Sequence, residues 1–140
     1  MSTLPERLAA GLAALSPHDL PTVEAFRALY HPDVEFRDPV QSLRGLEAFI
    51  AMNYRLLRRS KELSFEIHRT SGDDALCFLV WTARFVPKFG PRMEVEGVSE
   101  LEAKDGLVVR HRDYWDLGEL AASSIPGGRR ILAAILRPFA

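Results

Sequence analysis

The chain has 140 residues, of which 47% are hydrophobic and 26% charged, and its formal net charge is -1 at pH 7. A chain of this length builds one core, so we expect a single domain over residues 1–140. The balanced charge lacks the excess of Lys and Arg that neutralises phosphates, which argues against nucleic acid as a partner. We expect a cytoplasmic globular protein without a membrane span, because no apolar run approaches the roughly 18 residues that a span needs.

Helical patterns dominate the first half of the chain. Residues 4–15 and 20–30 are predicted helices, and the four residues between them are of the kind that cap and start helices. Residues 34–38 alternate as a strand does, and Pro39 ends it. In residues 46–60 the apolar positions recur at three and four residues, which predicts a third helix with one side in a core.

The second half changes to a period of two residues. It predicts long antiparallel strands and then two short helices in the tail. Helices followed by hairpins indicate an α+β fold, in which a cone-shaped, curved and mainly antiparallel sheet wraps over the three N-terminal helices. The concave side of such a sheet can hold a ligand, and a short C-terminal helix follows it. The predicted strands are 63–69, 75–86, 93–103 and 107–116, and the predicted tail helices are 117–122 and 129–136.

Cysteine and histidine are too sparse for a metal or redox site. Cys77 is the only cysteine, so an internal disulfide and a thiolate cluster are excluded. It lies in an apolar run, which predicts a buried core thiol and not a nucleophile. The four histidines show no ligand spacing, and no glycine-rich loop follows a strand in a dinucleotide pattern. We therefore expect neither a metal nor a cofactor.

Polar residues on apolar faces are the informative feature of the sequence. In the last predicted strand Leu107, Val109, His111, Asp113 and Trp115 alternate onto one face, so an apolar face carries an imidazole and a carboxylate. A carboxyl group in such surroundings must be paired, hydrogen-bonded or shifted upward in pKa, and a general base is made under those conditions. A buried ion pair for Asp113 and a satisfied core position for His111 are the structural alternatives.

Two earlier elements show the same anomaly. Phe36 and Asp38 share a face of the first strand with Val34, and Asn53 interrupts the apolar stripe of the third helix. Asp38 is a second candidate base, although it could instead cap the turn at Pro39. For Asn53 we favour a buried hydrogen-bonding role over a catalytic one.

The order of elements, together with Phe36-Arg37-Asp38-Pro39-Val40 and Arg112-Asp113-Tyr114-Trp115-Asp116-Leu117, resembles the nuclear transport factor 2-like superfamily in its SnoaL-like branch. The resemblance covers about residues 5–120 and implies a cystatin-like α+β barrel round a pocket. The later segment is similar to limonene-epoxide hydrolase, whose Asp, matched by Asp113, helps activate water and protonate the epoxide. The earlier segment is similar to ketosteroid isomerase, whose proton-shuttling Asp is matched by Asp38.

The catalytic partners of both enzyme templates are incomplete in this chain. The tyrosine that ketosteroid isomerase carries on a helix falls at Gly11, and its protonated Asp falls near Val98. The arginine and aspartate that limonene-epoxide hydrolase carries on an earlier strand fall at Leu79 and Trp81. The resemblance therefore implies the fold and a pocket more strongly than it implies either reaction.

These observations predict a small pocket protein that binds an apolar molecule of polyketide, steroid or terpenoid type. The alternative is a non-catalytic ligand-binding module or a dimeric interaction module, and the sequence leaves open whether the chain is an enzyme. Any chemistry would be acid-base catalysis of the isomerase, cyclase or hydrolase type. The candidate catalytic residues are Asp113, Asp38 and His111, and the candidate ligand-binding residues are Phe36, Asn53, Trp81, Trp115 and Val109.

Two surfaces of the expected fold are candidate contact surfaces for a partner. Many members of the superfamily are homodimers through the sheet, so the resemblance implies a homodimer here. The tail also carries an apolar stripe beside three arginines. This stripe could close the pocket, pack on a partner subunit or contact a membrane surface, in that order of preference. Its residues are Ile131, Leu132, Ile135 and Leu136.

Overall fold

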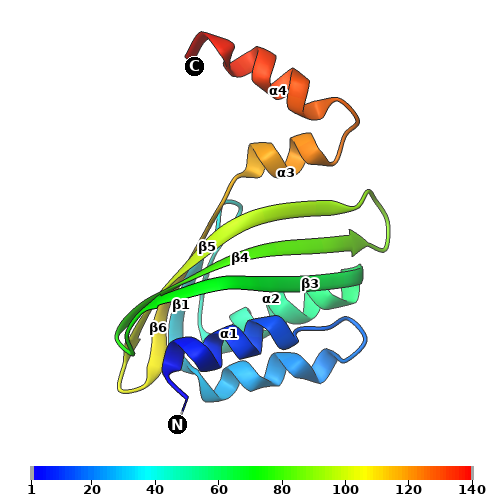
Figure 1. Cartoon of the computed structure of the whole chain (residues 1–140). Helices are drawn as coiled ribbons and strands as arrows, with labels where there is room; N and C mark the ends of the chain where they lie inside the picture. Colours follow the sequence, from blue (N-terminus) through cyan, green and yellow to red (C-terminus); the bar gives the residue numbers. More distant parts are fainter. Residues whose placement is uncertain (1, 140) are drawn as a thin grey trace.

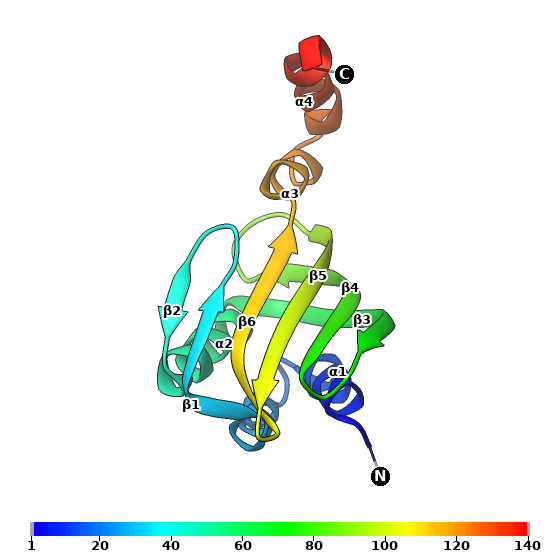
Figure 2. The same cartoon turned by 90° about the vertical axis from the view of Figure 1, so that its left-hand side faces the viewer.

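A curved sheet of six strands forms the centre of the molecule (Figure 1, Figure 2). The computed structural model describes residues 2–139. The strand order is β2-β1-β6-β5-β4-β3, and β1 with β6 is the parallel pair in an otherwise antiparallel sheet. The strands are β1 (Tyr30–Arg37), β2 (Ser42–Arg44), β3 (Ser60–Gly72), β4 (Leu76–Pro87), β5 (Met93–Lys104) and β6 (Leu107–Trp115).

Three helices cover the concave side of the sheet (Figure 1). They are α1 (Leu4–Ala14), the 3-10 helix η1 (Leu20–Ala28) and α2 (Leu46–Arg59). Buried apolar side chains of helices and strands meet between these two layers and form one core. The predicted α+β cone is therefore confirmed, with an open sheet whose edges are β2 and β3.

The second helix and the first strand differ from their predicted bounds. The helix is of the 3-10 type and ends at Ala28, and β1 already begins at Tyr30, which pairs with Val108. The pairing of β1 with β6 is interrupted between Tyr30 and Glu35. Pro32 lies in this interruption, where its missing N–H breaks no hydrogen bond of the sheet. The strand thus starts earlier than its alternating pattern indicates.

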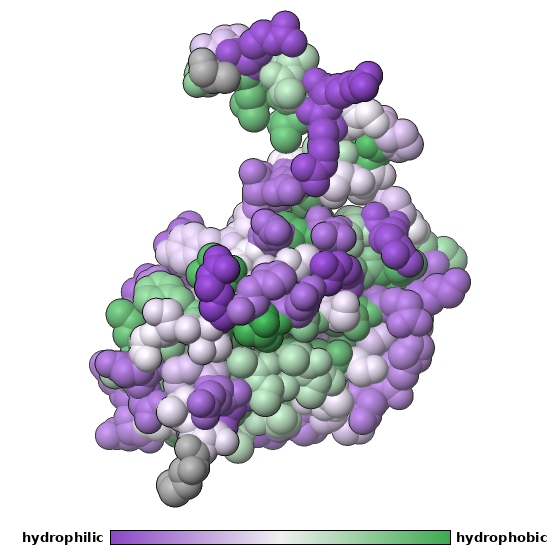
Figure 3. Space-filling view, viewed as in Figure 1, coloured by the Kyte–Doolittle hydropathy of each residue, from purple (hydrophilic) through white to green (hydrophobic). Residues whose placement is uncertain are grey.

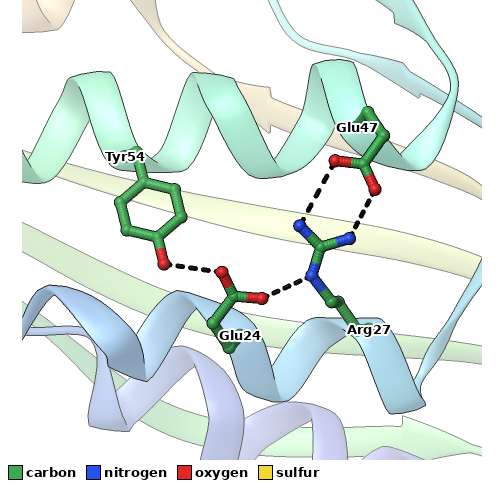
Figure 4. A network of polar contacts seen from close by, with 4 residues as sticks. All are labelled: Glu24, Arg27, Glu47 and Tyr54. Carbon is green, nitrogen blue, oxygen red and sulfur yellow. Dashed lines mark hydrogen bonds and ion pairs between the residues drawn. The ribbon is translucent and has the colours of Figure 1, made fainter.

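A surface network ties η1 to α2 (Figure 4). The guanidinium of Arg27 contacts the carboxylates of Glu24 and Glu47, and its Nη2 lies 3.2 Å from Glu47 Oε2. The hydroxyl of Tyr54 donates to Glu24 Oε1 at 2.7 Å. Because all four side chains are accessible to solvent, the network adds little to the stability of the fold.

The last strand contains a β-bulge that changes which of its residues face inward. Ala103 of β5 pairs with Val108, whereas the neighbouring Glu102 pairs with Arg110, so Val109 is an extra residue in β6. Val108 therefore shares the inner face with His111, and it is fully buried. The predicted alternation from residue 107 to residue 115 is wrong before the bulge, because an inserted residue reverses the order of inward and outward side chains.

The C-terminal residues form an arm that leaves the body of the cone (Figure 1). The arm consists of α3 (Leu117–Ser123), α4 (Gly128–Leu136) and the 3-10 turn η2 (Arg137–Phe139), so both predicted tail helices are confirmed. Asp116 caps α3 by accepting the N–H of Glu119 at 2.9 Å. Within the arm, α3 contacts β5, whereas α4 stands off the body, and apolar atoms gather on the lower side of the arm (Figure 3). Among residues 2–139, no helix has the length and apolar character needed to cross a membrane.

Candidate functional site

A small cavity lies inside the cone, between α2 and the inner face of the sheet. Its volume is about 70 Å³, and five polar side chains, from α2, β4, β5 and β6, stand at its wall. These are Asn53, Trp81, Ser99, His111 and Asp113. The rest of the wall is apolar and includes Leu12, Phe26, Phe36, Phe49, Leu56 and Phe65.

Four of these polar side chains, all except Asn53, belong to one chain of hydrogen bonds that also includes Tyr30. Trp81 Nε1 donates to Ser99 Oγ at 2.9 Å, and the Ser99 hydroxyl donates to Asp113 Oδ1 at 2.5 Å. His111 Nε2 donates to the same Oδ1 at 2.6 Å. Tyr30 Oη lies 2.8 Å from His111 Nδ1. The carboxylate thus receives two hydrogen bonds on one oxygen, in a protein interior where such bonds are strong.

The Tyr30 hydroxyl lies against one nitrogen of the imidazole. Burial raises the pKa of Tyr30 well above its usual value, and the negative charge of Asp113 raises it further. Tyr30 therefore keeps its proton, so its hydroxyl is a donor that Nδ1 of His111 can accept. On the other side of the ring, Nε2 lies against the Asp113 carboxylate, which accepts the hydrogen of that contact.

Aromatic rings hold the imidazole in place. The ring of His111 lies 5.0 Å from that of Phe36, 5.7 Å from that of Phe49 and 5.9 Å from that of Tyr30, measured between centroids. His111 is 7% exposed. Its orientation is fixed both by packing and by two hydrogen bonds, which is the arrangement expected for a group that positions a carboxylate.

Gly97 makes room for Trp81. The two residues are opposite each other on β5 and β4, and a Cβ atom built on Gly97 would lie 2.4 Å from Cη2 of the indole. The ring therefore lies across the glycine, and Nε1 reaches the next inward residue of β5, Ser99. A side chain at position 97 would displace this ring.

Five of the eight residues predicted for the site meet at this cavity: Phe36, Asn53, Trp81, His111 and Asp113. Asn53 is buried, and its Nδ2 donates to the carbonyl of Phe49 at 2.9 Å, which leaves its second amide hydrogen for another acceptor.

Three predicted residues are not brought to this cavity. Asp38 accepts the N–H groups of Val40 and Gln41 at 2.8 and 3.0 Å and so caps the turn after β1. Val109 is the bulged residue of β6 and does not line the cavity. Trp115 is half-buried and packs against the core beyond the cavity wall.

Two members of the network, Tyr30 and Ser99, were not among the predicted site residues. Tyr30 stood at the end of the second predicted helix, where nothing in the sequence indicates a contact with the last strand. The position of Ser99 in the sequence does indicate a place at the site. It lies between Gly97 and Leu101 on the side of β5 opposite the glutamates, so a hydroxyl stands on the buried face of the strand.

Other reactive groups lie apart from this site. Cys77 is buried, as predicted, and burial raises the pKa of its thiol to about 11, so it is not a nucleophile at neutral pH. Within residues 2–139 no three His, Cys, Asp or Glu side chains gather as a metal site requires.

Residues 8–111 match the family model of the SnoaL-like domain, and this stretch contains Tyr30, Trp81, Ser99 and His111. The chain belongs to the SnoaL-like domain family. Asp113 lies just beyond the matched stretch of this SnoaL-like domain. No functionally curated protein matches it by sequence.

Solved structures share the fold of this SnoaL-like domain. An LEH-like epoxide hydrolase of M. tuberculosis is 22% identical, with a TM-score of 0.72 over 96% of each chain. A protein assigned as a SnoaL-like polyketide cyclase from Jannaschia sp. CCS1 is 17% identical, with a TM-score of 0.71 over 85% of this chain and 92% of its own. A protein with a ketosteroid isomerase-like fold from Catenulispora acidiphila, in complex with trimethylamine, is 18% identical, with a TM-score of 0.71 over 88% and 94%. At these identities the likeness shows the fold alone.

Proposed function

We propose that this SnoaL-like domain binds an apolar small molecule of polyketide, steroid or terpenoid type and acts on it by acid-base catalysis without a cofactor. One observation carries the proposal. Asp113 Oδ1 accepts hydrogen bonds from Ser99 and His111, whereas no side chain or backbone group of residues 2–139 donates to Oδ2. A carboxylate held at one oxygen and free at the other, beside an apolar cavity, is suited to take a proton from a ligand.

The simplest reaction that this arrangement supports is the shift of a proton within a β,γ-unsaturated ketone. Asp113 Oδ2 takes the proton from the carbon between the carbonyl and the C=C bond. The electron pair of that C–H bond forms a new C=C bond to the carbonyl carbon, and the π pair of the carbonyl moves to its oxygen to give an enolate. The second amide hydrogen of Asn53 is a donor for this oxygen. Return of the proton to another carbon of the conjugated system completes an isomerisation, in which no other reactant is consumed.

His111 and Tyr30 act through Asp113 in this proposal. Both nitrogens of the imidazole are engaged, so His111 is a positioning residue that orients the carboxylate. Asp113 has one carboxylate oxygen that accepts no hydrogen bond from residues 2–139, which supports it over Asp38 as the base. Asp38 is instead engaged by the backbone of its own turn.

Deuterium exchange on a small probe tests the chemistry. We expect the protein to catalyse exchange of the acidic C–H protons of 2-cyclohexenone in D₂O, monitored by NMR. The variant Asp113→Asn should lose this rate by about 10²–10⁴-fold, which is the usual contribution of a positioned acid or base. Asp38→Asn is the matched control and should retain it. An unchanged rate in Asp113→Asn would refute the proposed base.

Binding without turnover is the second candidate function, and the satisfied hydrogen bonds around the cavity favour it. No buried side-chain N or O atom among residues 2–139 lacks a partner. A polar network that is satisfied within the protein can simply line a binding site. This candidate predicts that apolar ketones raise the melting temperature of the parent and of Asp113→Asn equally, with no exchange in either.

We also propose that two copies of the chain pair through the outer face of the sheet. Partnered residues of β4, β5 and β6 place four apolar or aromatic side chains together on this face. Charged side chains flank this group, as they do in the rim of an interface. The four are Phe78, Val80, Val98 and Tyr114, of which Phe78 and Tyr114 are exposed.

Light scattering tests the pairing. We expect a dimer for the parent and a monomer for Val98→Asp, since a carboxylate at the centre of the pair would lose its water. Val40→Asp, in the exposed turn after β1, is the control and should remain a dimer. A parent that stays monomeric at high concentration would refute the pairing.

A further inference from the structure

A second cavity lies beside the first, at the end of the cone where α2 and β4 finish. Its volume is about 360 Å³, and Gln41, Phe85 and Pro87 form part of its wall. Met52 and Leu56 of α2 belong to the walls of both cavities and are half-buried. Both side chains have several accessible rotamers, so their rotation would join the inner cavity to this outer one.

Two arginines stand at the outer cavity without a partner. Arg55 and Arg59 are one helical turn apart on α2, and both line the cavity and are exposed. No carboxylate of residues 2–139 forms an ion pair with either of them. Like charges four residues apart destabilise a helix by about 0.2–0.5 kcal/mol. The helix dipole offsets this for Arg59 in the last turn, but Arg55 precedes that turn.

The carboxylate of Asp38, which contacts Gln41, is already engaged by its own turn. Gln41 lies at the wall of the outer cavity, and its Nε2 donates to Asp38 Oδ2 at 3.1 Å. Asp38 accepts two backbone N–H groups as well. Three N–H groups therefore engage the Asp38 carboxylate, which forms no ion pair with Arg55 or Arg59.

We propose that Arg55 and Arg59 bind the carboxylate of an amphiphilic ligand in the outer cavity. Its apolar body passes between Met52 and Leu56 and brings its far end to Asp113. Guanidinium groups suit this task, because they bind carboxylates through paired hydrogen bonds. The inference rests on the proposed pocket and names its ligand class as an apolar acid of medium length.

Paired probes that differ only in the head group test this inference. Octanoate and octanol share a chain, and their dissociation constants are measured by titration calorimetry on the full chain. We expect octanoate to bind about tenfold more tightly than octanol, a difference of ~1.4 kcal/mol. Arg55→Gln with Arg59→Gln should remove this preference and leave octanol binding unchanged.

Arg58→Gln is the matched control. Arg58 lies on the same helix but stacks on Tyr54, with its guanidinium carbon 5.2 Å from the ring centroid, and does not line the outer cavity. The control should keep the preference for octanoate. If it loses the preference equally, general attraction of anions explains the binding and the inference is overturned.

The remaining outcomes separate this inference from the proposed function. If octanol and octanoate bind equally to the parent, the pocket stands and the role of the arginines is wrong. If neither probe binds, the proposed pocket fails, and this inference fails with it. A preference that survives in the double variant also overturns the assignment to Arg55 and Arg59.

Discussion

The body of the cone and the C-terminal arm use apolar side chains in opposite ways. In the body, Leu57 and Leu79 are 1% and 2% exposed. In the arm, Ile135 and Phe139 are 64% and 85% exposed. Hydrophobic stabilisation scales with the apolar area removed from water, so the body supplies the folding free energy and the arm adds little to it. An apolar helix stripe in a sequence therefore does not by itself identify a segment that holds a fold together.

Truncating one apolar side chain in each region gives the largest expected contrast. Leu57→Ala should lower the free energy of unfolding by about 2–5 kcal/mol, because it leaves a cavity between α2 and the sheet. Ile135→Ala in the arm should change it by less than about 0.5 kcal/mol. Urea denaturation measures both. Equal losses would mean that the arm is packed in solution.

Alanine substitutions at one glycine of the sheet and one glycine of the helical layer compare a close-packed site with a site that has room. Gly97→Ala should cost about 1–3 kcal/mol and should shift the fluorescence of Trp81, because the new methyl group would overlap the indole. Gly11→Ala in α1 is the control, since its Cβ would meet Phe26 Cε1 at 3.4 Å, an ordinary contact. We expect no loss of stability there, and a helix gains from alanine. A neutral Gly97→Ala would contradict the placement of Trp81.

Alkaline pH tests the burial of the core directly. The fold raises the pKa of Cys77 from 9.0 to about 11, so the protonated thiol is favoured in the native state. This contribution is fully present below pH 9 and is lost as the pH rises towards 11. It amounts to about 3 kcal/mol. Tyr30 adds a loss of the same sign above its usual pKa. In Cys77→Ala the decline of stability between pH 9 and 11, followed by urea denaturation, should be shallower. An unchanged decline would place the thiol in water.

Removal of the outer part of the arm, α4 and η2, should have a small effect on stability. A chain that ends at Ser123 loses α4 and η2, which contact α3 and little of the body. We expect a change of less than about 1 kcal/mol in the free energy of unfolding, together with weaker binding of a hydrophobic dye. A large loss of stability would show that the arm covers an apolar surface of the body or of a second copy.

The sequence predicts the fold well because the spacing of its apolar residues changes in the middle of the chain, from three and four residues to two residues. It also predicts that His111 and Asp113 face inward, since both follow the bulge in a regular part of β6. It could not predict the contact of Tyr30 with His111, because that contact depends on the parallel pairing of β1 with β6, which no local pattern encodes. Asp38 does not reach the cavity for a related reason. Strand alternation predicts which face a side chain lies on, but at the end of a strand the local turn competes for the hydrogen bonds of that side chain.

The extra residue at Val109 has a consequence for how this domain can change over time. It separates the β5–β6 hairpin turn from the part of β6 that carries His111 and Asp113. A single insertion or deletion in that turn can be absorbed at the bulge, where one unpaired residue is already tolerated. The reactive end of the strand then keeps its orientation while the hairpin varies in length, so the tip of this hairpin is a place where related chains can differ without turning their carboxylate out to solvent.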